Sequence, residues 1–448
     1  MNQLYAGYAR VNITPKLGIG LSGYYVPRKA EKVLDELELS VLSLSISEKR
    51  TVLISVDIIG IRQEFSRTIR QAVSRQCGVP FEGIFLHATH IHTGPFTFNG
   101  TNEDDPVVGE YSHFLLEKTV EAVREAIADE KKAMMGIGTG IAPNISFIRR
   151  FRMKDGSIRT NPGANNPDIL HPIGRVDDRV HVVRFDQENG KSLVLVNFAC
   201  HPDVIGGNHI SADWPGFVRR TVEKTLDDTS VIFFNGAQGD VNHVNVHPEG
   251  GFLNDTFRDF DDVFRGYGHA KYMARVVTGG VLQAYDKVAW QEVESLSYGQ
   301  RLVKIPSQMP KPSVMEQAHR IHALHEAGKD DQIPFQGMML TTVVAEAARM
   351  VRLEHGPESF EMAITAVRVG NVALAGFPGE PFSGIGWAIK ETSGFAMVIP
   401  TCLTNGHQGY FPMKEAYDEG GYEARSSNFQ SGVAETMIAE MQALLKSL

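Results

Sequence analysis

The stretch GIFLHATHIHTGP, residues 83–95, contains both a strand pattern and a cluster of reactive side chains. Its apolar run Ile-Phe-Leu predicts a short buried strand, and the closing Gly-Pro pair ends the segment. Between these lie His87, His90 and His92, and neutral imidazole is the commonest protein ligand for zinc. Alternate residues of an extended chain share a face, so His90 and His92 are expected to address one site. The stretch therefore predicts metal binding or acid–base chemistry at a strand end.

The residues before this stretch predict a strand–helix–strand unit. Residues 41–46 and 51–56 are rich in β-branched and other apolar residues, and residues 47–50 read as the turn of a hairpin. Apolar residues at helical spacing from 65 to 73 predict a helix that Gly78-Val79-Pro80 ends. Asp57 follows the second strand, as the histidines follow the third. Ligand-binding groups at the carboxyl ends of strands are usual in open α/β sheets.

Further polar side chains follow predicted strands along the rest of the chain. A hairpin over 180–185 and 192–199 leads to His201, and a strand over 230–234 leads to Asp240. Strands before Glu380 and Tyr410 repeat this arrangement, and Asp213 reads as the N-cap of a helix. Each residue alone has an ordinary structural explanation. Their common position points to one site built from these strand ends: Asp57, His90, His92, His201, Asp213, Asp240, Glu380 and Tyr410.

Two long segments depart from this pattern. Residues 144–178 show no period and contain five arginines, so we expect a long, ordered and functional loop. Residues 305–355 read as a helical excursion on the surface. No repeat or linker divides the chain, which favours one composite domain over residues 1–448.

Composition limits the class of protein. The chain has 448 residues, 42% hydrophobic and 22% charged, which is typical of a globular enzyme. A net charge of -9 without a basic block disfavours nucleic-acid partners, and no apolar run is long enough to predict stable membrane insertion. Three scattered cysteines predict no disulfide framework. The start lacks a signal-peptide pattern, so we expect a reduced, cytoplasmic protein with a small-molecule substrate. The sequence leaves the oligomeric state open.

Five segments, in order, resemble motifs of the neutral (non-lysosomal) ceramidases, zinc-dependent amidases that cleave ceramide. They are HATHIHTGP (87–95), NFACHPDV (197–204), NGAQGDVNHVN (235–245), FPGEPF (377–382) and the tyrosine-rich GHQGYFPMKEAYDEGGYEA (406–424). The resemblance covers the family's catalytic domain and not its additional C-terminal β-domain. It implies an α/β fold of two stacked, mixed β-sheets flanked by helices, an αββα-like sandwich.

The resemblance also implies one Zn²⁺ with two histidines, a glutamate and a tyrosine as ligands. These correspond to His90, His201, Glu380 and Tyr410, although His407 stands where the family has its first tyrosine of the last motif. His92 then becomes the acid or base beside the metal.

The family's catalytic arginine falls at Arg149, and Asn242 replaces a serine of its glycine-rich turn. Arg149 or Arg150 would hold a substrate oxygen, the alternative being that both only pair with acidic residues near Asp177 and Asp178. Asp57, Asp213 or Asp240 would orient the histidine rings.

The implied activity is hydrolysis of an N-acyl bond. Hydrolysis of an ester or glycosidic bond in a polar substrate, or ligand binding without turnover, are the alternatives. The segments flanking the histidines are rich in Asn, Asp and Gly, with large apolar surface only at Phe96, Phe98 and Trp214. We therefore expect a small, water-soluble substrate in preference to long-chain ceramide.

Overall fold

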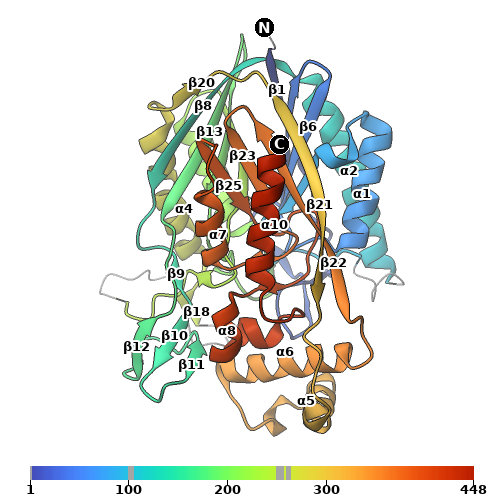
Figure 1. Cartoon of the computed structure of the whole chain (residues 1–448), viewed down its shortest axis with the longest axis vertical. Helices are drawn as coiled ribbons and strands as arrows, with labels where there is room; N and C mark the ends of the chain where they lie inside the picture. Colours follow the sequence, from blue (N-terminus) through green and yellow to red (C-terminus); the bar gives the residue numbers. More distant parts are fainter. Residues whose placement is uncertain (1–2, 99–104, 249–256, 259–263) are drawn as a thin grey trace.

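The computed structural model describes residues 3–98, 105–248, 257–258 and 264–448. Two β-sheets lie face to face between layers of helices, as Figure 1 shows. This is the fold class that the sequence predicts. Within the described residues, no helix combines the length and the apolar character that crossing a bilayer requires.

The larger sheet runs in the order β16-β14-β13-β8-β1-β5-β6-β7, with β20 paired to β8. Its strands are β1 (Leu4–Asn12), β5 (Glu38–Ile46), β6 (Lys49–Val56), β7 (Ile84–Ala88), β8 (Lys131–Ile141), β13 (Arg179–Gln187), β14 (Ser192–Phe198), β16 (Thr229–Asn235) and β20 (Ala289–Gln291). The pairs β6–β7 and β14–β16 are parallel, and the other neighbours are antiparallel. The strands β7 and β14, one from each parallel pair, lead into the histidine segments.

The strand–helix–strand unit of the sequence is confirmed. The strands β5 and β6 form the expected hairpin, and Ser47 in its turn has a positive φ of 55°. The helix α1 (Gln63–Cys77) ends at Gly78, which has a φ of 70° and donates its amide to the Ser74 carbonyl. Glycine adopts this left-handed conformation without a steric penalty, so it ends the helix as expected.

The smaller sheet has the order β21-β22-β23-β25. Its strands are β21 (Leu296–Pro306), β22 (Ser359–Val369), β23 (Val372–Gly376) and β25 (Met397–Thr401). Sequence reasoning missed β21, in which only three of the 11 residues are buried, so no clear apolar period marks the strand. Side chains of both sheets, such as Phe185 and Val367, form one buried core between them.

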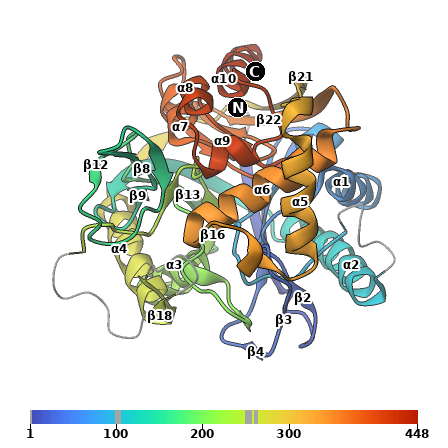
Figure 2. The ribbon, with the colours of Figure 1, turned by 90° about the horizontal axis from the view of Figure 1, so that it is seen from below.

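Helices cover the outer faces of both sheets. The helices α1 and α2 (Pro106–Ala128) pack on one half of the larger sheet, and α3 (Asp213–Thr225) and α4 (Tyr267–Tyr285) on the other. The smaller sheet is covered by α7 (Ser383–Lys390) and α10 (Val433–Ser447). The helices α5 (Met315–Glu326) and α6 (Gly337–Leu353) lie across the lower end of the sandwich in Figures 1 and 2. The short helix α9 (Tyr422–Ser426) lies beside α6 in Figure 2, and α8 (Lys414–Glu419) lies near α10.

The segment 144–178 contains short strands, which corrects the expectation of a long loop. Its strands β10 (Arg150–Met153), β11 (Ile158–Thr160) and β12 (Ile169–Pro172) form a small sheet. Strands of three or four residues are too short to reveal a period in the sequence. The other short elements are β2 (Gly20–Leu21), β3 (Arg28–Lys29), β4 (Lys32–Val33), β9 (Phe147–Ile148), β15 (His209–Ile210), β17 (Val241–Asn242), β18 (Phe257–Arg258), β19 (Phe264–Arg265), β24 (Glu380–Pro381), β26 (Tyr410–Phe411) and the 3₁₀ turns η1 (Phe81–Gly83), η2 (Pro312–Val314) and η3 (Asp330–Gln332).

Candidate metal centre

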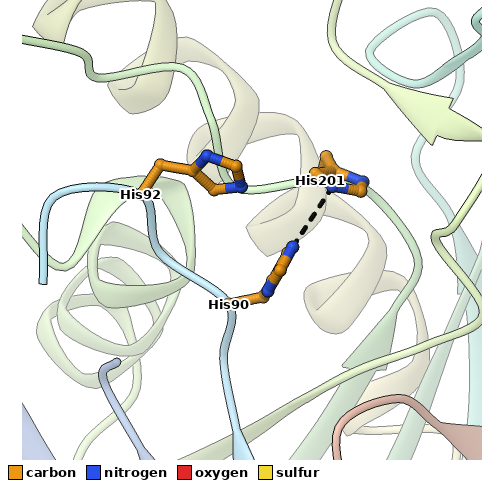
Figure 3. Close-up of side chains that lie close together, drawn as sticks. All are labelled: His90, His92 and His201. Carbon is orange, nitrogen blue, oxygen red and sulfur yellow. Dashed lines mark hydrogen bonds between the residues drawn. The ribbon is translucent and has the colours of Figure 1, made fainter. Parts of the chain in front are cut away.

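The loop after β7 holds two of the histidines. Its course is fixed by the His90 amide, which donates to the Ile58 carbonyl at 2.9 Å. His90 has a φ of 76°, so the chain is not extended there, and the predicted alternation is not what brings His90 and His92 together. Their ring centres nevertheless lie 5.0 Å apart, and Figure 3 shows both rings beside His201. A non-glycine residue in this strained conformation is typical of functional sites.

His201 and Glu380 reach the same point from distant parts of the chain. His201 follows β14, and its amide donates to the Val241 carbonyl at 3.1 Å. Glu380 begins β24, which pairs with β26 so that Glu380 lies opposite Tyr410. A Cβ on Gly239 would lie 2.5 Å from the Glu380 carbonyl oxygen. Only glycine allows this turn to approach the Glu380 backbone so closely.

Three side-chain atoms converge at the centre of the site. The Nε2 atoms of His90 and His201 are 3.2 Å apart, and they lie 3.2 and 3.3 Å from Glu380 Oε2. The Nδ1 atom of His90 lies 2.7 Å from the Ile59 carbonyl, and that of His201 lies 3.0 Å from the Gln238 carbonyl. Carbonyl oxygens only accept hydrogen bonds, so both Nδ1 atoms carry a proton, and in the neutral form of each ring the Nε2 atom presents a lone pair.

This arrangement places three acceptors against one another. Glu380 Oε2 has no hydrogen-bond donor in the part of the chain that the structure describes. His90 and Glu380 have side chains only 3% and 5% exposed, so solvent cannot compensate for the repulsion. A proton or a metal cation among the three atoms would offset this repulsion.

The three converging atoms fit zinc. A tetrahedral site with bonds of about 2.0–2.1 Å has ligand atoms roughly 3.3 Å apart, close to the distances between these atoms. His92 belongs to the same cluster, because one ring nitrogen each of His90, His92 and His201 lies within 4.8 Å of the others. Backbone carbonyls hold the other ring nitrogens of His90 and His201, as they commonly do around metal-ligating histidines.

Burial and neighbouring charges set the protonation of these groups. Burial, together with the charge of Arg149, lowers the pKa of His201 to about 4, so the ring is neutral at neutral pH. Burial alone would raise the pKa of Glu380, but His90, His201 and His407 hold it well below its usual range. His201 therefore presents a neutral imidazole and Glu380 a carboxylate, the protonation states in which these groups bind metal.

His92 differs from its neighbours because neither ring nitrogen forms a hydrogen bond within the described residues. Its Nδ1 atom lies 3.6 Å from Oδ1 of Asp203, which accepts a 2.5 Å hydrogen bond from the Tyr24 hydroxyl. The His92 side chain is 12% exposed, and burial lowers its pKa well below the usual value. A neutral ring beside a carboxylate can accept a proton, and the carboxylate then stabilises the imidazolium.

The two arginines expected to hold a substrate oxygen, Arg149 and Arg150, are both paired with carboxylates. The Arg149 Nε atom donates to Glu423 at 2.6 Å, its Nη2 atom donates to the Gly239 carbonyl at 2.8 Å, and its guanidinium carbon lies 5.4 Å from the centre of the Tyr410 ring. Arg150 pairs with Glu419 at 3.0 Å. Glu423 and Glu419 are not the partners that the sequence suggested, which were acidic residues near Asp177 and Asp178.

The acidic partners suggested for these arginines lie elsewhere. Asp177 instead pairs with Arg179 at 2.8 Å and with Lys390 at 2.7 Å. Asn242, the third residue assigned to catalysis, donates to the side chain of Asn161 at 3.0 Å and lines a cavity with Arg149.

The three aspartates do not contact the histidine rings, which corrects the expectation that they orient them. Asp57 forms a buried ion pair with Arg219. Asp240 accepts two hydrogen bonds from Ser383 at the start of α7. Asp213 opens α3 and accepts the amides of residues 204, 205 and 214, while burial raises its pKa to about 7. A strand-end position in the sequence does not specify which neighbour a carboxylate faces.

Two cavities meet at the metal centre. The first has a volume of about 380 Å³ and contains His90, Glu380 and His407, whose Nε2 atom lies 3.9 Å from Glu380 Oε1. The second, of about 370 Å³, contains His201 and apolar residues of α6. Both cavities are lined by the same residues around the metal centre: Gly23, Tyr24, Tyr25, His92, Tyr410 and Tyr422. Tyr25 and Tyr422 line both cavities, and their hydroxyl groups lie 3.1 Å apart.

Sequence reasoning missed several residues of the site. Asp203 lies two positions after His201 in the same motif, and this spacing could have identified it. Glu423, with a fully buried side chain, and the tyrosines of residues 24–25 come from segments without a strand-end signal. Trp214, expected near the substrate, instead packs against Phe198 in the core.

Comparison with known proteins shows the fold. No family model and no curated protein matches the sequence. The solved structure of neutral ceramidase from Pseudomonas aeruginosa superposes with a TM-score of 0.73 over 99% of this chain and 74% of that one, at 17% identity. A ceramidase complexed with C2 also has a TM-score of 0.73 and 17% identity, over 100% of this chain and 76% of that one. The chain thus has the neutral ceramidase fold, as its motifs predict.

Proposed function

We propose that this protein is a zinc-dependent hydrolase that cleaves an N-acyl (amide) bond. The observation that carries the proposal is the buried group of three acceptor atoms from His90, His201 and Glu380 at 3.2–3.3 Å. The fold it shares with proteins described as ceramidases supports the reaction class.

His90, His201 and Glu380 would hold the ion, with Tyr410 beside Glu380 as the fourth or a nearby ligand. Zinc in a site with an open position polarises a carbonyl group and lowers the pKa of a water molecule to about 7. The carbonyls of Ile59 and Gln238 fix the orientation of both histidine rings, so that both Nε2 atoms would be available to the ion.

His92 would carry the proton. A ring nitrogen of neutral His92 accepts it from the attacking water and delivers it to the leaving nitrogen. The carboxylate of Asp203, 3.6 Å away, stabilises the charged ring between these two steps. Arg149 lines the second cavity, but its Nε and Nη2 atoms bind Glu423 and the Gly239 carbonyl and its guanidinium group lies against the Tyr410 ring, so its role is to position Tyr410.

The substrate would lie with the amide at the metal centre and one arm in each cavity. The second cavity offers an apolar wall from Val26, Met338, Leu340 and Val344, whereas the first is lined by a mixture of polar, charged and apolar side chains. This lining suits a small, water-soluble amide better than ceramide with its two long chains.

The test is to purify the chain without chelators and measure its metal by inductively coupled plasma mass spectrometry. Hydrolysis is then compared for short N-acyl compounds, matched esters, linked sugars and detergent-dispersed ceramide, before and after chelation. We expect about one zinc per chain and amide cleavage that chelation abolishes and zinc restores.

Three results would contradict parts of the proposal. Ester or glycoside cleavage without amide cleavage would change the reaction class. A loaded site that turns over none of these compounds would indicate a binding protein. Ceramide cleavage at rates that rise with acyl length would overturn the preference for a soluble substrate.

A further inference from the structure

Two arginines from distant elements line the first cavity together with His90 and Glu380. Arg62 occupies the N-cap position of α1, and Arg352 lies in the last turn of α6. Both side chains are solvent-accessible, so both guanidinium groups can meet a ligand that enters the cavity.

These two arginines lack the carboxylate partners that other arginines of the site have. Within the described ranges, Arg62 forms no hydrogen bond or ion pair, and Arg352 donates only to the side-chain oxygen of Asn428. Arg149 and Arg150, by contrast, each pair with a glutamate. A difference in burial does not explain this contrast, because exposed arginines such as Arg159 also pair with a carboxylate.

The cavity itself supplies no compensating negative charge near them. Among the described lining residues, Glu380 is the one carboxylate. It faces the rings of His90, His201 and His407. Desolvation lowers the pKa of Arg62, with the charge of Glu64 acting in the opposite direction. Desolvation also lowers the pKa of Arg352, and the positive charge of Arg62 adds to this effect. An anion between the two guanidinium groups would relieve both effects.

The local backbone adds to the positive potential. Arg62 is the N-cap of a helix of 15 residues, and its side chain does not cap the helix. The free amides of a helix N-terminus favour a negative charge nearby.

Both arginines line the cavity that contains His90 and Glu380, and the chain ties Arg62 closely to the metal centre. The Ile59 carbonyl holds the ring of His90, and a Cβ on Gly60 would lie 2.4 Å from the ring of His407. Arg62 is two residues further on. Its Cα therefore lies at most about 11 Å from that of Ile59, since an extended residue spans at most ~3.6 Å.

We propose that Arg62 and Arg352 form an anion subsite that binds a carboxylate or phosphate group on one arm of the substrate. Resting on the proposed amide hydrolysis, this inference narrows the substrate class to anionic amides such as N-acylated amino acids. Guanidinium groups match the planar, two-oxygen geometry of a carboxylate and also bind phosphate, so either group satisfies the site.

The kinetic test compares each anionic amide with a neutral partner that has the same acyl group. N-acetylglycine is compared with N-acetylglycinamide, and N-acetyl-2-aminoethyl phosphate with N-acetylethanolamine. We expect kcat/KM to favour the anionic member of at least one pair by about 10- to 100-fold, as a charge-assisted hydrogen bond allows. The pair with the larger preference identifies carboxylate or phosphate as the group bound.

The variants Arg62→Gln and Arg352→Gln should each reduce this preference by about 10-fold or more. Arg67→Gln is the matched control, because Arg67 is exposed on the same helix and lines neither cavity. It should leave the preference unchanged. Equal kcat/KM values for the anionic and neutral amides would overturn the anion subsite. A preference for the anionic amide that neither Arg62→Gln nor Arg352→Gln alters would also overturn it.

A binding measurement separates this inference from the proposed function. In 4-oxopentanoate a methylene group replaces the amide nitrogen of N-acetylglycine, so it binds without being hydrolysed. Calorimetric titration of the full chain should show tighter binding of 4-oxopentanoate than of 4-oxopentanamide. This difference in affinity should be lost in both Arg62→Gln and Arg352→Gln. Binding of this kind without hydrolysis of any amide would support the anion subsite and overturn the proposed function. Absence of the binding difference in a chain that cleaves amides would overturn the anion subsite alone.

Discussion

Replacing His90 by glycine and by alanine tests the metal centre and its backbone in one comparison. Both substitutions remove the Nε2 atom that lies 3.2 Å from His201 and from Glu380. Loss of a partner in the outer shell of a metal site already costs about 10- to 100-fold in affinity, and loss of a ligand costs at least as much. We expect zinc content to fall from about one per chain to below roughly a tenth, with amide hydrolysis falling in proportion.

The two variants should differ in stability. His90 has a φ of 76°, a conformation that costs alanine about 1–2 kcal/mol and glycine almost nothing. Glycine loses about 0.5–1 kcal/mol more chain entropy on folding, so the glycine variant should be the more stable by about 1 kcal/mol. Both variants leave the Ile59 carbonyl without its donor, so that cost cancels.

The assay is urea unfolding of both metal-free variants, followed by circular dichroism, with zinc content measured on the same preparations. Equal slopes with a higher midpoint for glycine would show a difference in stability alone. Full zinc loading in either folded variant would refute the ligand assignment. An alanine variant as stable as the glycine variant would refute the strain at residue 90.

Three further substitutions separate the roles of neighbouring residues. His92→Ala should retain zinc but lose roughly 10²- to 10⁴-fold in kcat, the range for a positioned acid–base group; loss of zinc would make His92 a ligand. Arg149→Lys should keep zinc but lower kcat/KM about 10- to 100-fold, because one ammonium group cannot replace both the 2.6 Å bond to Glu423 and the 2.8 Å bond to the Gly239 carbonyl. A loss of stability with unchanged kinetics would make Arg149 purely structural. Asp57→Ala should lower the free energy of unfolding by about 3–5 kcal/mol, since it leaves Arg219 buried without its main partner, and zinc content should not change. Loss of zinc in a folded Asp57→Ala protein would contradict this separation.

Local patterns account for what the sequence predicted correctly. The hairpin of β5 and β6, the helix α1 and the end of β7 follow from residue periodicity and from Gly78, which act within a few positions. The order of five motifs predicted the two-sheet fold.

The positions of His90, His201 and Glu380 could be expected from the same motifs. Their separation could not, because a distance of 3.2 Å between His90 and His201 depends on how β7 and β14 are placed across the larger sheet.

Charged residues show most clearly what only the tertiary structure decided. The sequence marked the arginine-rich segment as the substrate-binding part, but Glu423 and Glu419 neutralise Arg149 and Arg150. Arg62 and Arg352 carry no motif and are far apart in the chain, yet they line one cavity. The sequence by itself determined which residue types follow which strands, because backbone propensity and side-chain period are local. Which charges are paired and which remain open to a ligand depends on contacts between distant segments, and only the packing of the two sheets and their helices decides it.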